Sequence, residues 1–226
     1  MTDVLLETVS DGVATLTMNR PDRRNALSGE MMAGFLEALP RLAADPDVGV
    51  VVITGTGKAF CAGGDVKAMA EGTEFKENSL EAKARALRSD MEVSGWLHKM
   101  TKPTIAMVPG AAAGAGLSIA LACDLRIAGE SAKFTTAFGR VGYSGDFGGS
   151  YFLTRLVGTA KARELYFTSA LIGAAEALNL GIVNRVVPDQ QLQTEVTDLS
   201  QQMAKGPQIA LSYMKKNLNA AETGTL

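Results

Sequence analysis

Two stretches of the sequence decide the fold: residues 48–65, VGVVVITGTGKAFCAGGD, and residues 104–116, TIAMVPGAAAGAG. Each begins with a run of β-branched and other apolar residues, which is typical of a strand buried on both faces. Each then continues into a glycine-rich turn. Glycines after a buried strand let backbone N–H groups approach a ligand closely, often at the start of a helix. The two turns together therefore predict a ligand site made of main-chain donors.

The rest of the chain alternates strand-like and helix-like patterns around these stretches. Residues 13–18 alternate in polarity, as in a half-buried strand. Residues 28–42 and 80–98 carry apolar side chains at helical spacing. Ser28 is placed to cap the first of these helices, and Pro40 is expected to kink or end it. Strands that alternate with helices predict an α/β protein built from βαβ units.

The chain of 226 residues is long enough to bury roughly 70% of its unfolded surface without disulfide bonds. It contains no internal repeat and no long polar linker. We therefore expect one core domain, residues 1–188, followed by a C-terminal helical segment, residues 189–226. The stretch from Gly72 to Ser79 is predicted to be a loop.

Composition and charge exclude several classes of function. Lys and Arg number 22 against 24 Asp and Glu, and the formal net charge of -2 comes with no basic tract, so nucleic acid is not an expected partner. Cys61 and Cys123 suit neither a disulfide framework nor a metal site. The N-terminus lacks the apolar run of a secretory signal. Residues 105–123 have the length of a membrane span but are interrupted at Pro109. We expect a cytoplasmic protein with no membrane or metal partner.

Cofactor motifs fit the two turns poorly. Neither turn contains a complete dinucleotide-binding GxGxxG pattern, and Gly57-Lys58 lacks the remaining residues of a phosphate-binding P-loop. Two readings stay open for the glycines. They permit tight turns and close packing, or their N–H groups form a pair that holds an oxyanion.

Four motifs together resemble the enoyl-CoA hydratase/isomerase (crotonase) superfamily. In chain order they are Asn19-Arg20-Pro21 through Asn25-Ala26-Leu27, Ala59 to Asp65, Lys102-Pro103 through Gly116, and Gly181-Ile182-Val183 through Pro188. The resemblance covers nearly the whole chain. It implies a crotonase-like (ClpP/crotonase) α/β fold, a spiral of ββα turns with a C-terminal helical region. It also implies an acyl-CoA thioester substrate, coenzyme A as part of that substrate, no separate cofactor, and a homotrimer or dimer of trimers.

The same resemblance assigns residues to the site. The backbone N–H groups of Gly64 and Ala115 are implied to form the oxyanion hole, with Ala115 standing where the family usually has glycine. Main-chain contacts to coenzyme A are implied at Arg24, Ala26, Ala62, Asp65 and Val66. Asp65 has an alternative interpretation as a helix N-cap, and Arg24 as a solvated surface charge.

The chain departs from the family pattern at the catalytic acids. Where hydratases of the family carry two glutamates, this sequence has Ser118 and Phe138. Asp146, in contrast, lies where the epoxyphenylacetyl-CoA isomerases, dienoyl-CoA isomerases and chlorobenzoyl-CoA dehalogenases place a catalytic aspartate. The resemblance therefore implies that Asp146 is the acid/base. The alternative is that Asp146 caps a helix predicted over residues 148–156.

One carboxylate can take a proton from one carbon and return it to another once two N–H donors stabilise the enolate. Hydration also requires an activated water, for which Ser118 is a poor base. We therefore predict an enoyl-CoA isomerase that uses Asp146. An enoyl-CoA hydratase with atypical acid/base residues and a non-catalytic acyl-CoA-binding subunit remain as alternatives. Aromatic dehalogenation, with Asp146 as nucleophile, is not favoured by a chain with 6% aromatic residues.

The remaining candidates have weaker signals. Ser118, Phe138 and Tyr143 are candidate substrate contacts, although the Ser118 hydroxyl could instead bond to its own helix. The single histidine, His98, is expected to be a core residue rather than a catalyst, and Cys61 has no neighbouring base. In the family, further helices usually follow the region of Met214 to Leu218. Because the sequence ends at Leu226, we expect either a truncated chain or a short form with an open pocket.

Overall fold

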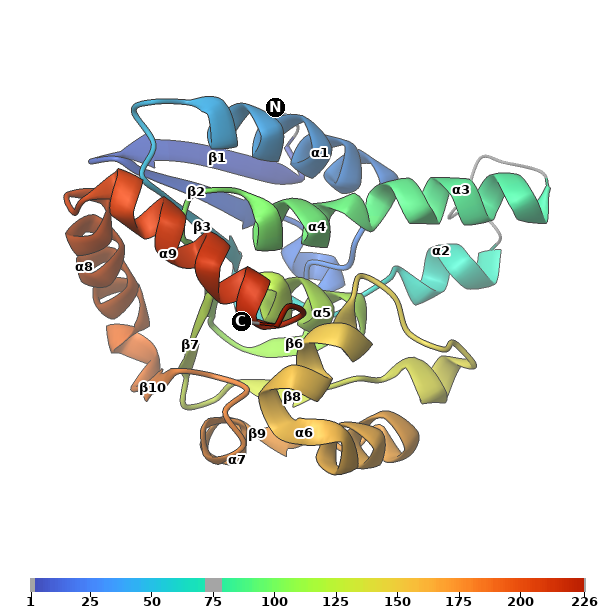
Figure 1. The fold of residues 1–226 in the computed structure, drawn as a ribbon. Helices are drawn as coiled ribbons and strands as arrows, with labels where there is room; N and C mark the ends of the chain where they lie inside the picture. Colours follow the sequence, from blue (N-terminus) through green and yellow to red (C-terminus); the bar gives the residue numbers. More distant parts are fainter. Residues whose placement is uncertain (1–2, 72–78, 226) are drawn as a thin grey trace.

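A computed structural model describes residues 3–71 and 79–225, which form two sheets with helices around them (Figure 1). Among these residues the larger sheet has six strands, in the order β1 (Leu5–Ser10), β2 (Val13–Met18), β3 (Val50–Gly55), β5 (Thr104–Val108), β7 (Leu125–Gly129) and β10 (Arg185–Val187). The smaller sheet of the described chain consists of β4 (Ala59–Cys61), β6 (Ala111–Ala113), β8 (Lys133–Thr135) and β9 (Ile172–Gly173).

The two sheets are connected by a repeated path of the chain. In each repeat a strand of the large sheet leads directly to a strand of the small sheet, as β3 leads to β4, β5 to β6, and β7 to β8. Within each sheet these neighbours pair in parallel. A helix then returns the chain to the large sheet. The expected spiral of ββα turns is therefore confirmed.

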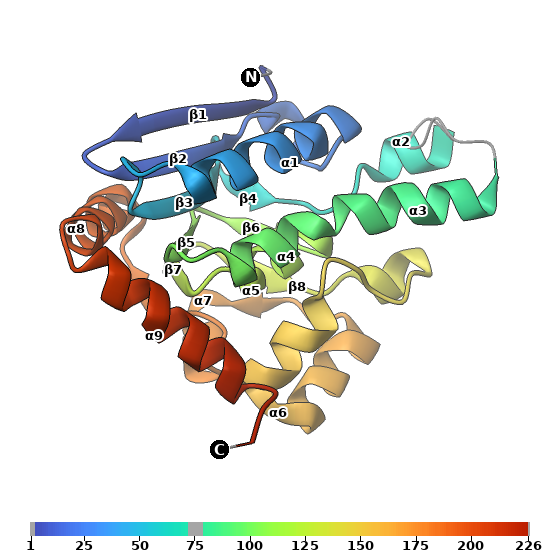
Figure 2. The ribbon, with the colours of Figure 1, turned by 45° about the horizontal axis from the view of Figure 1, so that its top comes forward.

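The helices cover both faces of the large sheet. They are α1 (Gly29–Ala44), α2 (Val66–Glu71), α3 (Leu80–Asp90), α4 (Glu92–Lys99), α5 (Ala115–Ala122), α6 (Gly149–Thr168), α7 (Ala174–Asn179), α8 (Leu192–Ala204) and α9 (Gln208–Ala221), with short 3₁₀ helices η1 (Pro21–Arg23), η2 (Phe138–Val141) and η3 (Asp189–Gln191). Successive side chains of a strand point to opposite faces. Thus Val51 and Ile53 of β3 enter the main core with α1 and α5, whereas Val50 and Val52 face α8. Figure 2 shows α2 and α3 together at the end of the molecule away from α8 and α9.

Two helix predictions differ from the structure, and one of the two outcomes expected at Pro40 does not occur. Pro40 does not end α1, which continues to Ala44, because Leu39 and Leu42 on either side of the proline are fully buried and hold the last turn against the core. The helix expected over residues 80–98 is divided at Met91 into α3 and α4. Its first residue, Leu80, was expected on the apolar face and is 79% exposed.

Other expectations have a clear outcome. Ser28 caps α1, since its hydroxyl oxygen accepts a hydrogen bond from the Met31 N–H at 3.3 Å. The apolar stretch 105–123 forms β5, β6 and α5. Among the described residues, every helix is too short or too polar to cross a membrane. Most of the loop predicted over residues 72–79 lies outside the described residues, which resume at Ser79.

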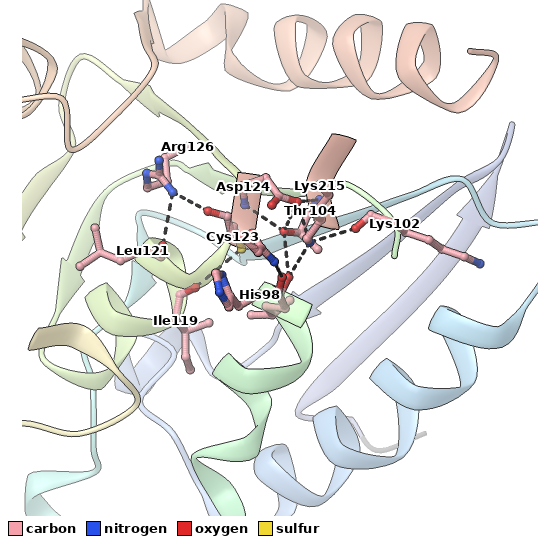
Figure 3. Close-up of polar contacts among 11 residues, drawn as sticks. His98, Lys102, Thr104, Ile119, Leu121, Cys123, Asp124, Arg126 and Lys215 are labelled. Carbon is pink, nitrogen blue, oxygen red and sulfur yellow. Dashed lines mark hydrogen bonds and ion pairs between the residues drawn. The ribbon is translucent and has the colours of Figure 1, made fainter. Parts of the chain in front are cut away.

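A buried ion pair attaches α9 to the core (Figure 3). Lys215 is only 6% exposed, and its ammonium group donates to Asp124 Oδ2 at 2.8 Å and to the Leu97 carbonyl at 2.8 Å. The same Asp124 oxygen accepts from the N–H and the hydroxyl group of Thr104 at 2.7 and 2.9 Å. One lysine therefore joins the C-terminal helix to α4, β5 and the start of β7.

Candidate active site

A cavity of about 250 Å³ lies where the two glycine-rich turns meet the N-terminus of α1, the C-terminal end of α3 and residues 137–147. Gly64 and Ala115 line it from the two turns. Asp146 lines it from the loop before α6. The structure therefore brings together the three residues that the sequence assigned to the oxyanion hole and to acid/base chemistry.

The two turns meet because β4 and β6 are neighbouring strands, with Cys61 paired to Ala112. Gly63 then adopts a positive φ of +89°, a conformation that side chains rarely adopt. A Cβ on Gly63 would lie 2.8 Å from the Ala113 carbonyl oxygen and 3.4 Å from the Ala115 nitrogen. Only glycine therefore allows the first turn to approach the second this closely.

The N–H groups of Gly64 and Ala115 are available to a ligand. Ala115 is the first residue of α5, whose first N–H groups have no acceptor within the helix. Gly114 before it has φ 52° and ψ -127°, which glycine adopts readily. Outside the regular helices and strands, no backbone hydrogen bond of the described chain uses either N–H group. Ala115 itself has no positive φ, so its methyl group is compatible with a donor position.

The loop before α1 fastens the first turn in place. The buried Asn25 side chain donates to the carbonyls of Thr56 and Ala59 at 2.9 and 2.8 Å. The Leu27 N–H donates to the Gly63 carbonyl at 2.8 Å. These contacts explain why the motif of residues 19–27 and the turn occur together in the sequence.

The residues implied for coenzyme A fall into two groups. Ala62 and Asp65 line the cavity, whereas Arg24 and Ala26 do not. The Arg24 side chain is exposed, and its carbonyl accepts from the Ala62 N–H at 3.0 Å. Ala26 is buried, and its carbonyl accepts from Arg20 at 2.6 Å. Val66 begins α2, and its side chain lies outside the described part of the structure.

Asp65 is the N-cap of α2, as one of its two interpretations expected, and it also lines the cavity. Its carboxylate pairs with the Arg20 guanidinium at 2.9 Å and accepts from the Ala68 N–H at 3.2 Å, as an N-cap of α2 does. Burial alone would raise the pKa of this carboxyl, but the Arg20 and Ala68 hydrogen bonds hold it below its ordinary value. Asp65 is thus a charged, structurally fixed part of the cavity wall.

Asp146 differs from Asp65 in its role at the helix terminus, in its hydrogen bonding and in the direction of its pKa shift. Its side chain does not cap α6, and its backbone carbonyl instead accepts the Gly149 N–H at 3.0 Å. The Oδ1 atom is buried without a hydrogen-bond partner in the described part of the chain. Burial raises the pKa of this carboxyl to about 6. The neighbouring Phe147 is buried with φ +48°, an uncommon conformation for a bulky residue. A turn with an uncommon backbone conformation thus carries a carboxyl whose pKa is raised above its ordinary value.

Of the other three candidate substrate contacts, two line the cavity and one does not. Phe138 and Tyr143 line the cavity, and the Tyr143 ring is half exposed at its edge. Ser118 is buried outside the cavity wall and bonds to the Gly114 carbonyl of its own helix turn at 3.3 Å. The alternative interpretation of Ser118 is therefore the one that the geometry favours.

Sequence reasoning missed Asp90, the last residue of α3, which lines the same cavity as Asp146. The helical spacing indicates this position, because Asp90 follows Leu87 by three residues and such residues share a helix face. Leu87 and Met32 form apolar wall beside it. Arg20, which the motif contained without a role, is the ionic partner of Asp65.

His98 and Cys61 do not line this cavity. His98 packs edge-on against Tyr151 and Phe152 and has its pKa lowered by burial. Cys61 is fully buried, and burial raises the pKa of its thiol to about 12. No cluster of three or more metal-binding side chains occurs within the described ranges.

A spiral of ββα turns whose two glycine-rich turns line one cavity defines a crotonase-type protein. The family described as enoyl-CoA hydratase/isomerase matches residues 8–226, and the chain belongs to this family. The family and fold predictions are thereby confirmed. Membership implies an acyl-CoA thioester as substrate.

Relatives and solved structures cover almost the whole chain. It is 35% identical over 218 residues to 4-chlorobenzoyl coenzyme A dehalogenase-1 of Arthrobacter sp, covering 96% of this chain and 78% of the relative. It is also 35% identical to the 1,2-epoxyphenylacetyl-CoA isomerase of Escherichia coli (strain K12), covering 100% and 86%. An enoyl-CoA hydratase structure from Polaromonas sp. JS666 superimposes with a TM-score of 0.91 at 34% identity, covering 98% and 85%. These names span three chemistries, so similarity alone leaves the reaction open.

Proposed function

We propose that this protein is an enoyl-CoA isomerase that shifts a double bond of an acyl-CoA thioester, with Asp146 as its single acid/base. The observation that carries the proposal is the placement of Asp146. It is a half-buried carboxyl with a pKa raised to about 6 and a buried, unpartnered Oδ1, and it lines the same cavity as the two main-chain donors.

The chemistry follows from these groups. The thioester carbonyl would accept hydrogen bonds from the N–H groups of Gly64 and Ala115. These bonds strengthen as negative charge moves onto the oxygen when a proton leaves carbon. The Asp146 carboxylate takes that proton and returns it to another carbon of the same enolate. Each main-chain donor is expected to contribute about 10²–10³ in rate.

Substrate anchoring and assembly belong to the same proposal. Ala62 and Asp65 border the cavity, and this position supports the coenzyme A contacts that the family resemblance implies for them. Arg24, Ala26 and Val66 complete the proposed coenzyme A site, and Phe138 and Tyr143 the acyl wall. We also propose a trimer or a dimer of trimers, which light scattering of the purified protein tests.

A second candidate, hydration, is favoured by Asp90. Hydration needs a group that activates water in addition to one that exchanges a proton at carbon. Asp90 and Asp146 line one cavity from different elements, α3 and the loop before α6. Two carboxylates in one site fit this requirement, although neither of them occupies the positions of the family's glutamates.

A non-catalytic binding subunit is the least supported alternative. A carboxylate turned away from the donors to cap a helix would have favoured it. Asp146 instead faces the cavity and leaves the cap of α6 to a backbone carbonyl.

The test follows the conjugated-thioester absorbance with two substrates. A 3-enoyl-CoA gains this absorbance on isomerisation, whereas a 2-enoyl-CoA loses it on hydration. We expect gain with the first substrate, loss of that activity in Asp146→Asn, and retention in Asp90→Asn. Activity on the 2-enoyl-CoA alone, abolished by either substitution, would support hydration. Binding of both thioesters by calorimetry without conversion would support the silent subunit.

A further inference from the structure

A second cavity, of about 600 Å³, lies between α4, the start of α6 and the C-terminal end of α9 (Figure 2). Polar contacts hold these three helices around it. The Asn219 side chain of α9 donates to the His98 carbonyl of α4 at 2.8 Å. The Tyr151 hydroxyl of α6 donates to the carboxylate of Glu222, the residue after α9, at 3.1 Å. The second cavity is therefore enclosed by three parts of the chain that are distant in sequence.

Apolar and aromatic side chains form much of the wall of the second cavity. Met91 and His98 line it from α4, Tyr151 and Phe152 from α6, and Ala220 from α9. The Phe152 ring lies edge-on to the rings of His98 and Tyr151, with centroids 5.3 and 5.2 Å away. Burial lowers the pKa of His98, so its ring is uncharged at neutral pH. Such a wall favours an apolar ligand.

The charged side chains of this wall lie at its exposed edge. Arg88 and Glu92 form an ion pair one helical turn apart, with 68% and 45% of their side chains exposed. Lys99 is exposed as well. These groups interact with water at the rim and leave the inner wall to apolar contacts.

The second cavity adjoins the active-site cavity at two pairs of consecutive residues. At the break between α3 and α4, Asp90 lines the active-site cavity and Met91 lines the second one. In the turn before α6, Phe147 lines the active-site cavity and Gly148 lines the second one. Consecutive Cα atoms are about 3.8 Å apart, so a single layer of chain separates the two cavities at both places.

The two residues on the far side of this layer leave room for a passing chain. Gly148 contributes no side chain, and a Cβ there would lie 2.9 Å from the Phe152 ring. Met91 is half-buried, and its unbranched side chain adapts readily to a neighbour. The smallest residue type and one of the most adaptable therefore stand where the two cavities adjoin.

The active-site cavity is small for an acyl chain. Its volume is about 250 Å³, whereas a single benzene molecule already occupies a cavity of about 150 Å³. The thioester group and the carbons that exchange a proton fill part of this space. Asp146, Phe147 and Gly148 are consecutive, so an acyl chain that continues past Asp146 along this turn reaches the second cavity.

We propose that the second cavity binds the distal part of a long aliphatic acyl chain, which passes from the active-site cavity between Met91 and Gly148. This inference rests on the proposed function, and it names long-chain acyl-CoA thioesters as the substrate class. Each methylene that moves from water to an apolar wall contributes about a fourfold gain in affinity. A short acyl group ends in the first cavity and gains nothing from the second.

The test compares hexanoyl-CoA with dodecanoyl-CoA by calorimetry, at concentrations below those at which the longer thioester forms micelles. We expect the wild type to bind dodecanoyl-CoA at least about tenfold more tightly. Ala220→Trp fills the second cavity from α9 and should remove most of this difference without changing the affinity for hexanoyl-CoA. The matched control is Ala221→Trp, at the next residue, which is equally exposed and does not line the cavity.

A second variant fills the cavity from the opposite wall. In Gly95→Leu the new side chain starts beside the flexible Glu92 carboxylate, 3.1 Å from the Cβ position, and it should have the same selective effect as Ala220→Trp. Equal affinities of the wild type for the two thioesters would overturn the proposal. A preference for dodecanoyl-CoA that survives in both Ala220→Trp and Gly95→Leu would overturn it as well.

Turnover separates this proposal from the proposed function. With 3-dodecenoyl-CoA as a converted substrate, Ala220→Trp should raise KM about tenfold, and with 3-hexenoyl-CoA it should leave KM unchanged. If the wild type converts no enoyl-CoA but Ala220→Trp still removes its preference for dodecanoyl-CoA, the isomerase proposal fails and the acyl-chain site stands. If both enoyl-CoAs are converted but binding does not depend on chain length, the acyl-chain site fails and the isomerase proposal stands.

Discussion

The amide nitrogen of Ala115 lies 3.4 Å from the position that a Cβ on Gly63 would occupy, so the two glycine-rich turns are in direct backbone contact. This contact follows from the pairing of β4 with β6 rather than from any side chain. The geometry of the proposed oxyanion hole is therefore fixed by the small sheet. Side chains around it can vary, as they do at Ser118 and Phe138, while the donor pair stays in place.

A methyl group at Gly63 should separate these turns. In Gly63→Ala the new Cβ meets the Ala113 carbonyl oxygen at 2.8 Å in a backbone with φ +89°. We expect activity to fall by about 10² or more, as for loss of one oxyanion donor. Gly181→Ala is the matched control, because it has a similar φ of +76° and only an ordinary contact at 3.7 Å. Both variants should lose about 1 kcal/mol of stability from the positive φ, but only Gly63→Ala should lose turnover. Equal activities of Gly63→Ala and Gly181→Ala would contradict the assignment of the oxyanion hole to these two turns.

Asp146 should lower stability at neutral pH. Its folded pKa of about 6 lies above the ordinary 3.8, so the folded protein binds this proton more tightly than the unfolded chain. Stability therefore falls as pH rises from about 4 to about 6. Because the side chain is partly exposed, we expect Asp146→Asn to gain only about 1–2 kcal/mol at pH 7.5 and nothing at pH 4. Urea unfolding at both values measures this, and a gain that is the same at pH 4 would exclude a raised pKa.

The Lys215–Asp124 pair should be essential for docking α9. Lys215→Met leaves the Asp124 carboxylate without its cation, and we expect a loss of about 2–4 kcal/mol. Adding Asp124→Asn should restore part of this loss, because no uncompensated charge then remains. Lys216→Met, next in the chain and exposed, should change stability by less than about 0.5 kcal/mol. Thermal unfolding of the wild type, Lys215→Met, Asp124→Asn and the double variant measures the coupling, and additive effects of the two single substitutions would show that the pair does not act as a unit.

The sequence predicts the parts of this fold that depend on local pattern. The buried strands around Val51 and Ile105 and the turns after them carry their own signals, and the motif resemblance adds their order in space. What the pattern does not contain is the direction of a helix after a single glycine. Gly158 has the same appearance as any glycine within a helix, yet it reverses α6 and brings the Tyr166 hydroxyl next to Gly149.

The sequence pattern also fails to predict where some polar residues lie, both at the site and in the core. Lys215 stands among polar residues that are typical of a solvated surface, and only the tertiary position of α9 shows that it is buried. Asp90 follows the apolar face of α3 by spacing, but its place in the cavity depends on the break at Met91. The sequence indicates Gly64, Ala115 and Asp146 as candidate site residues more directly than it indicates Asp90, because each of the three lies in a short motif beside the end of a regular element.

The central claim is that Asp146 moves a proton at a carbon next to a thioester held by Gly64 and Ala115. Exchange of the α-protons of a saturated acyl-CoA with D₂O, followed by mass spectrometry, measures that step without a choice between isomerisation and hydration. We predict exchange catalysed by the wild-type protein and a rate about 10²–10⁴ lower in Asp146→Asn, with unchanged binding of the thioester. Exchange at the wild-type rate in Asp146→Asn would contradict the account, because another group would then be the base.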